Sequence, residues 1–173
     1  MKTQEVKWNK EVVESACFRL DESTRMIKKC LVLWKDEDIW IKPNEVSNSI
    51  GNLLLHICGN MTQYIISSLG EQKDVRNRKK EFEIQKGPTI KELTAMLERT
   101  VKKAKKVLRE ASGDDLLKMR SVQGFKFSGI GVVMHAVEHY SYHTGQIAVW
   151  TKMIRNQDLG FYNGLDLNSK NKI

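Results

Sequence analysis

Three of the four histidines recur at every fourth position of one stretch, at His135, His139 and His143. Residues four apart on a helix have Cβ atoms about 5–6 Å apart, so two imidazoles can bind one ion without distorting the backbone. The pairs His135/His139 and His139/His143 have the same spacing, and helix geometry alone does not choose between them. Four residues advance a helix by about 400°, slightly more than one turn, so the three rings drift around the helix axis by roughly 80° in total. We therefore do not expect one ion to use all three.

The fourth histidine, His56, lies in a polar ribbon on a second, otherwise apolar segment. The side chains of this ribbon are spaced by four, four and three residues: Asn52, His56, Asn60 and Gln63. The segment with the histidine pair carries a matching ribbon, which consists of Glu138, His139, Tyr142, His143 and Gln146. If the two ribbons face each other inside the fold, their buried polar groups need partners, and a metal ion would supply one. The competing interpretation is that either ribbon simply faces water.

Other polar residues are weaker candidates for the same site. Asn60 and Gln146 could bind the ligand histidines or a substrate, although ordinary helix polarity explains them equally well. Tyr142 is a less specific candidate of the same kind, and Glu138 could only balance nearby charge. A charged connection contains Arg76, Arg78 and Glu81, which could shape an active-site loop; we expect a solvated loop instead.

Apolar residues repeat with the helical period in four segments, each bounded by capping or stop residues. The predicted helices cover about 9–34, from a cap at Ser47 or Asn48 to about 69, from a cap at Thr89 to about 111, and from a cap at Ser128 to about 154. Residues 71–88 form a long connection with a short helix at about 78–84, and residues 122–127 form an extended or turn segment. The tail after Gln157 is expected to be irregular.

This pattern predicts an all-α fold, a four-helix bundle with long connections that occupies residues 1–173 as a single domain. An up-down-up-down order is possible, but the connections are long enough for crossovers. The chain has 173 residues, which leaves no room for a second full domain. No strand pattern competes with the four helices.

Composition narrows the class of protein further. The formal charge is +8, and Lys102, Lys103, Lys105 and Lys106 cluster on the third predicted helix. We interpret these lysines as a solvated face and expect no nucleic-acid binding, because no DNA- or RNA-reading motif accompanies them. Three cysteines without CxxC spacing favour a reducing compartment. The absence of a signal-like or membrane-spanning apolar run predicts a soluble, cytoplasmic protein.

Two segments together resemble the signature helices of the DinB-like superfamily. They are residues 48–56 (NSIGNLLLH) and 135–147 (HAVEHYSYHTGQI). Residues 74–82 (DVRNRKKEF) and 158–162 (DLGFY) resemble a subgroup of unknown function, so the similarity covers nearly the whole chain.

The resemblance implies a four-helix bundle with a divalent metal ion held by His56, His139 and His143. The metal would be zinc, nickel or iron, and His135 would not be a ligand. Members of this superfamily include bacillithiol-type S-transferases and a mycothiol-dependent isomerase, and homodimers are common among them. We therefore expect a metal-dependent thiol S-transferase or hydrolase that acts on a small molecule with a low-molecular-weight thiol. The alternative is a non-catalytic, metal-stabilised module that binds a small ligand.

Overall fold

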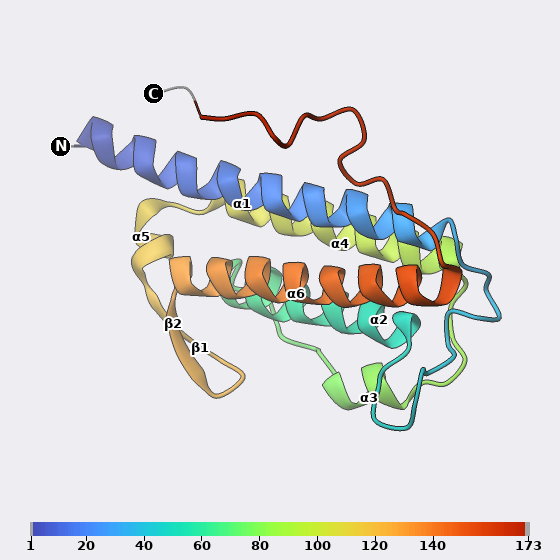
Figure 1. Ribbon diagram of the computed structural model, residues 1–173. Coiled ribbons are helices and arrows are strands. Elements are labelled where there is room, and N and C mark those ends of the chain that lie inside the picture. Colours follow the sequence, from blue (N-terminus) through green and yellow to red (C-terminus); the bar gives the residue numbers. More distant parts are fainter. Residues whose placement is uncertain (1, 172–173) are drawn as a thin grey trace.

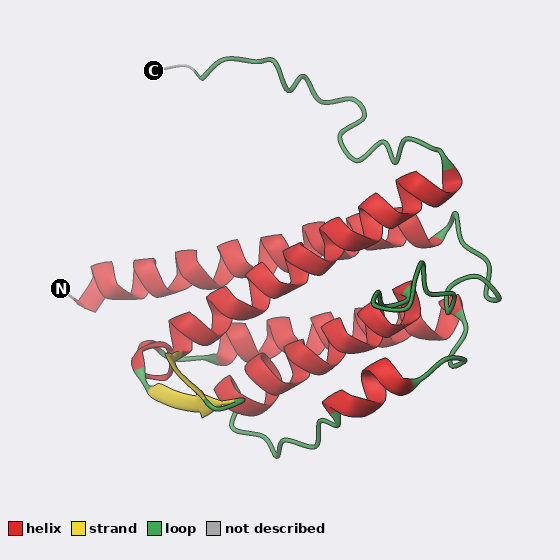
Figure 2. Ribbon diagram, turned by 60° about the horizontal axis from the view of Figure 1, so that its bottom comes forward, coloured by secondary structure: helices red, strands yellow, loops and turns green. Residues whose placement is uncertain are grey.

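The computed structural model describes residues 2–171, and its main feature is a bundle of four long helical segments (Figure 1). These are α1 (Lys2–Leu31), α2 (Ile50–Met61) with its π-helical continuation η1 (Thr62–Leu69), α4 (Ile90–Glu110) and α6 (Gly129–Arg155). Helices dominate the fold, with one small hairpin at an end of the bundle (Figure 2). The predicted all-α bundle is confirmed.

The order of the helices includes a crossover. α1 packs against α4 and α6, and α2 packs against the same two helices. Figure 1 shows that α1 and α6 run in one direction while α2 and α4 run in the other. Because α2 and α4 are parallel, the chain between them must return along the bundle, and this return segment contains the short helix α3 (Arg78–Glu83). The up-down-up-down order is therefore not adopted.

Side-chain caps fix where the helices begin. The Thr89 hydroxyl accepts the Glu92 backbone N–H and closes a capping box, and Ser128 accepts the N–H of Gly131, as the sequence predicts. The second helix is capped by Ser49 rather than by Ser47 or Asn48. Asn52 decides this, because its side chain lies three residues after Ser49 and accepts the Ser49 backbone N–H.

Several boundaries differ from the sequence prediction. α1 extends over Lys2–Leu31 instead of about 9–34. It ends earlier than predicted because the N–H groups of Leu33 and Trp34 donate to the residue three positions back rather than four. The last part of the second helix is a π-helix, and the Gly70 N–H donates to Ile65 O at its end. Ser112 not only follows α4 but also caps an unpredicted helix, α5 (Gly113–Leu117).

A two-stranded antiparallel hairpin replaces the extended or turn segment expected near residue 124. Its strands are β1 (Met119–Val122) and β2 (Phe125–Ser128), paired with Val122 opposite Phe125. The two residues between them, Gln123 and Gly124, both have positive φ, which is the backbone required by the tightest right-twisted hairpin turns. The hairpin leads directly into α6.

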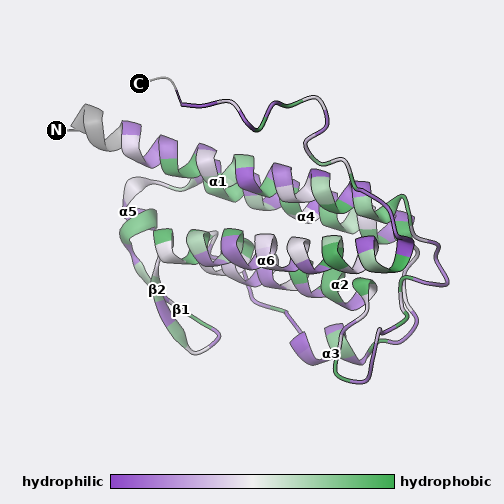
Figure 3. Cartoon of the chain, viewed as in Figure 1, coloured by the Kyte–Doolittle hydropathy of each residue, from purple (hydrophilic) through white to green (hydrophobic). Residues whose placement is uncertain are grey.

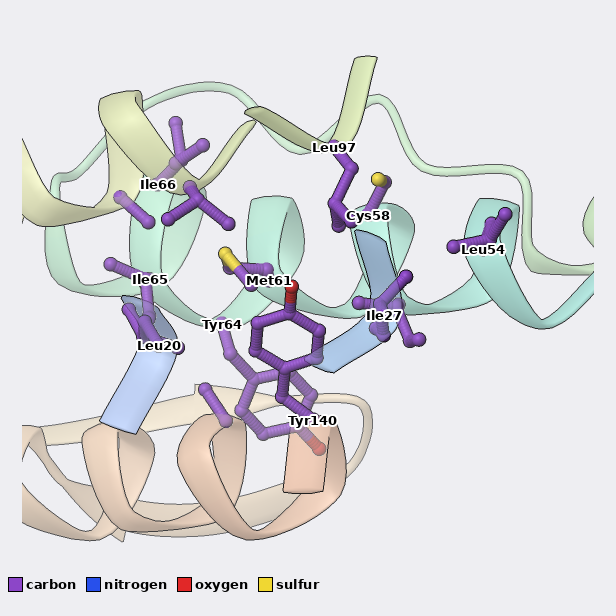
Figure 4. Packing of buried hydrophobic residues seen from close by; sticks show 14 of the residues in the cluster. Leu20, Ile27, Leu54, Cys58, Met61, Tyr64, Ile65, Ile66, Leu97 and Tyr140 are labelled. Atoms are coloured by element: carbon purple, nitrogen blue, oxygen red, sulfur yellow. The ribbon is translucent and has the colours of Figure 1, made fainter. Parts of the chain in front are cut away.

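The core lies between the four helices and includes side chains from each of them (Figure 4). α1 and α4 alternate hydrophilic and hydrophobic residues along their length, as expected for helices with one buried stripe (Figure 3). α2 is buried on most sides, which explains its unusually apolar sequence. Tyr140 is buried in the core, where its hydroxyl lies 2.9 Å from Thr24 Oγ1.

No helix in the described part of the chain is both long and apolar enough to cross a lipid bilayer. Two lysines of the run on α4 form ion pairs: Lys105 pairs with Asp21 of α1, and Lys106 pairs with Glu110 of α4.

Candidate metal centre

Three imidazoles from two antiparallel helices converge at one point between α2 and α6. His56 Nε2 lies 3.0 Å from His139 Nε2, which lies 3.3 Å from His143 Nε2. The potential ligand nitrogens of the three residues all lie within 4.8 Å of one another. His56 is buried, while His139 and His143 are partly buried. The three histidines are thus positioned to bind a metal ion.

The hydrogen-bond partners of two rings show which nitrogens are free to bind. His56 Nδ1 lies 2.8 Å from Glu81 Oε2, and His143 Nδ1 lies 2.6 Å from Gln146 Oε1. Both partner oxygens are acceptors, so a hydrogen on each Nδ1 would be bound there, and each Nε2 would then present a lone pair. A hydrogen on His139 Nε2 could be donated to only one of these two lone pairs, so the other lacks a donor unless a cation lies between the rings. The donor set and its orientation therefore fit a divalent metal.

The protein environment favours the neutral form of His139 and His143. The pKa of His139 is lowered to about 3, mainly by burial and in addition by the neighbouring rings of His143 and His56. Burial also lowers the pKa of His143, despite the opposing hydrogen bond with Gln146. Neutral imidazole is the form that binds metals, so protons compete weakly with a cation at neutral pH.

The structure resolves which histidine pair of α6 joins His56. His135 lies one turn before His139, with the two ring centroids 5.7 Å apart, but it is not part of the group of converging ligand atoms. Its ring stacks on Tyr64 with a centroid separation of 4.1 Å, and its Nε2 lies 3.4 Å from Asn60 Nδ2. The cluster therefore consists of His56, His139 and His143, and Asn60 is directed to His135 instead.

The two polar ribbons face each other only in part. Asn52 turns toward the backbone that ends α3, and Gln63 toward Arg76, rather than toward α6. Glu138 is exposed, and Tyr142 is 62% exposed, with its ring edge against His143 at a centroid distance of 5.0 Å. The 27-residue helix α6 packs against both α1 and α2, so only a narrow strip of its surface contacts each of them. Glu138 and Tyr142 lie at the edge of the strip and therefore reach solvent.

Two residues beside the histidines were expected to lie in a solvated loop. The expected solvated loop is wrong for Arg76 and Glu81, whose side chains are only 2% and 9% exposed. Arg76 Nε donates to Glu81 Oε1 (2.7 Å) and Nη2 donates to Glu81 Oε2 (2.8 Å). Arg78 is exposed as expected, with its guanidinium over the Phe82 ring. Helical periodicity gives no signal for such a pair. Only the length and charge of the connection, and the resemblance of residues 74–82 to a known subgroup, pointed to this segment.

The Glu81 carboxylate is ionised in the folded protein. Burial opposes ionisation, but hydrogen bonds from Arg76 and His56 outweigh it and hold the pKa of Glu81 below its usual value. On the other side of the His56 ring, Phe82 packs at a centroid distance of 4.7 Å. α3 therefore supplies both the hydrogen-bond acceptor and an apolar cover for the buried histidine.

Solved structures share this fold. A DinB-like protein from Bacillus subtilis is 20% identical, with a TM-score of 0.65 over 88% of this chain and 96% of its own. A DinB-like protein from Bacillus cereus is 16% identical, with a TM-score of 0.66 over 86% and 93% of the two chains. A mycothiol-dependent maleylpyruvate isomerase is 14% identical, with a TM-score of 0.63 over 78% of this chain and 60% of its own.

The chain therefore has the fold of the solved DinB-like proteins and carries three histidines that could hold a metal ion. It belongs to the family described as "Protein of unknown function (DUF1572)", which it matches over residues 7–163. Among curated protein sequences, none matches this chain.

Proposed function

We propose that this protein is a divalent-metal-dependent enzyme of the thiol S-transferase or hydrolase type. The convergence of three imidazoles, two with their Nδ1 atoms held by Glu81 and Gln146, is the observation that supports this proposal. Three neutral ligands leave the charge of a divalent ion uncompensated and a coordination position free, as in catalytic rather than closed structural sites.

The residues of the chain have distinct roles in this proposal. His56, His139 and His143 hold the ion, which when bound lowers the pKa of a thiol or water beside it. Glu81 and Gln146 fix the orientation of two of these rings, and Phe82 shields His56 from water. Substrate approaches from the side of His139 and His143, because His56 is only 5% exposed.

The thiol in this proposal comes from a small molecule rather than from the protein. All three cysteines are buried, and burial raises the pKa of each thiol. A buried protonated thiol is a poor nucleophile. The similarity in fold to a mycothiol-dependent isomerase supports a low-molecular-weight thiol as co-substrate.

Metal content and turnover test the proposal together. Untagged protein should contain about one divalent ion per chain, and its metal-loaded form should join a low-molecular-weight thiol to an electrophile or hydrolyse an ester. His139→Ala should lose the metal and lower turnover by at least on the order of 100-fold. His135→Ala, one turn away on the same helix, is the matched control and should keep the metal. Equal turnover in wild type and His139→Ala would remove the proposed role. Imidazole suits zinc, nickel and iron alike, so the same analysis identifies the ion.

The second candidate function is a metal-stabilised module that binds a small ligand without turnover. It is favoured by a surface groove of about 900 Å³ between α1 and α6, lined by Met26, Val137, Tyr142 and other residues but by none of the three histidines. Such a volume suits a small organic molecule. A large fall in melting temperature on chelation, with no chemistry on thiol or ester panels, would favour this function.

Two further expectations stay predictions. We place the protein in the reducing cytoplasm, which the three free thiols favour, and we expect a homodimer. Light scattering of the metal-loaded protein at several concentrations tests the oligomeric state.

A further inference from the structure

The Nδ1 atom of His56 faces two groups with opposite hydrogen-bonding character. Glu81 Oε2 lies 2.8 Å away, and Arg76 Nη2 lies 3.1 Å away. An ionised carboxylate can only accept a hydrogen bond, and a guanidinium can only donate one. A protonated Nδ1 can therefore bind only Glu81, whereas a bare Nδ1 can bind only Arg76.

These two arrangements have opposite consequences at the other ring nitrogen. A neutral imidazole carries one hydrogen, so protonation at Nδ1 leaves Nε2 with a lone pair directed toward His139, 3.0 Å away. If Arg76 donated to Nδ1 instead, the hydrogen would sit on Nε2 and block it as a ligand. We infer that Glu81, oriented by Arg76, is a positioning residue that selects the Nδ1–H tautomer of His56. This inference rests on the metal centre of the proposed function.

The geometry favours Glu81 over Arg76 as the partner of His56. Arg76 already donates through Nε and Nη2 to the two Glu81 oxygens, and through Nη1 to Gln63 Oε1 at 3.0 Å. Each of its three nitrogens therefore has an acceptor other than the imidazole. The charges of the two side chains also cancel, so the pair supplies an acceptor without adding net negative charge beside the metal ligands.

The fold provides a fixed place for the carboxylate. The Asn52 side chain donates to the backbone oxygens of Glu81 (3.0 Å) and Ile84 (2.8 Å), which ties the end of α3 to the start of α2. One turn after His56, Gly59 leaves room for the ion pair, because a Cβ there would lie 2.0 Å from Glu81 Oε1. The ion pair thus packs directly against the backbone of the helix that carries the histidine.

The tautomer can be measured in the metal-free protein by long-range ¹H–¹⁵N correlation of the histidine rings. In the wild type, His56 should carry its hydrogen on Nδ1. In Glu81→Ala, the hydrogen should move to Nε2, because Arg76 becomes the partner of Nδ1. Zinc affinity, measured by competition with a chromophoric chelator, should fall about 10- to 100-fold. Glu83→Ala on the same helix, whose side chain is exposed, is the matched control and should change neither quantity.

A double variant separates tautomer selection from a merely structural role. Adding Arg76→Met to Glu81→Ala removes the competing donor, so the double variant should bind zinc more tightly than Glu81→Ala alone. Lost packing alone would make the double variant bind zinc no better than the single one, and this result would overturn the inference. An Nε2–H tautomer of His56 in the wild type would also overturn the inference. This measurement does not depend on the folding of any variant. Failure of the proposed function would look different, because the wild type would then lack zinc binding or turnover while its His56 tautomer remained measurable.

Discussion

The cysteine thiols show how strongly burial controls reactivity in this protein. Cys58 of α2 is buried beside α4, and burial raises the pKa of its thiol to about 12. Cys17 and Cys30 of α1 are buried as well, and burial raises their pKa values in the same direction. The neutral thiol is the inert form, so these residues behave as small apolar side chains that fill the core.

The raised pKa of Cys58 makes stability sensitive to alkaline pH. The unfolded thiol ionises near pH 9, whereas the folded thiol keeps its proton to about pH 12. Between these values the unfolded state binds fewer protons than the folded state. The contribution of Cys58 to the free energy of unfolding is therefore complete below pH 9 and declines as pH rises. Urea unfolding of metal-free protein from pH 8 to 10 should show a smaller decline in the free energy of unfolding for Cys58→Ala than for the wild type. Parallel declines would contradict this explanation.

At the scale of elements, two glycines inside long helices, Gly59 and Gly145, have different surroundings. Gly59 of α2 lies against the Glu81–Arg76 pair, and a Cβ there would lie 2.0 Å from Glu81 Oε1 and 2.9 Å from Arg76 Nε. Gly145 of α6 is exposed, and a Cβ there would meet nothing within 4 Å. Both positions are inside helices, where alanine is intrinsically favoured over glycine by about 1 kcal/mol.

Alanine substitution at these two glycines should therefore have opposite effects. Gly145→Ala should raise the free energy of unfolding by up to about 1 kcal/mol, because only helix propensity changes. Gly59→Ala should lower it by about 1–3 kcal/mol, because overpacking displaces a buried ion pair. Chemical denaturation of both variants measures the difference. A gain in stability for Gly59→Ala would show that the ion pair moves aside without cost.

At the scale of the whole molecule, the histidine centre joins helices that are distant in sequence. His56 of α2 and His139 of α6 are 83 residues apart, and each helix also packs on α4 or α1. An ion held by both would cross-link the bundle near its middle. Binding to the folded state alone stabilises a protein by about 2.7 kcal/mol when free ligand is 100-fold above Kd.

Removing the metal should therefore lower the melting temperature. For a domain of this size, the loss corresponds to roughly 5–10 °C. Calorimetry of the zinc-loaded protein with and without a chelator measures it, and His143→Ala should show no effect of the chelator. An unchanged melting temperature in the chelated wild type would mean that the centre does not hold the ion.

The sequence predicted most of the fold because its signals are local. The apolar period, Thr89 with Glu92, and Ser128 act within one or two turns, and each helix they define is present. The π-helix of η1, the helix α5 and the hairpin were not predicted, because each is short and depends on packing against the bundle. Helix direction also depends on the path of the connections, which periodicity does not describe.

For the site, the sequence by itself determined that His139 and His143 share a helix face, since a four-residue spacing fixes this wherever the helix lies. Only the tertiary structure decided that His56 joins them while His135 stacks on Tyr64, because α2 and α6 must pack in one register for this to occur. The tertiary structure also decided that the side chains of Glu81 and Arg76 are buried rather than exposed to solvent. The chain between η1 and α4 has to return along the bundle, and that path lays α3 against His56.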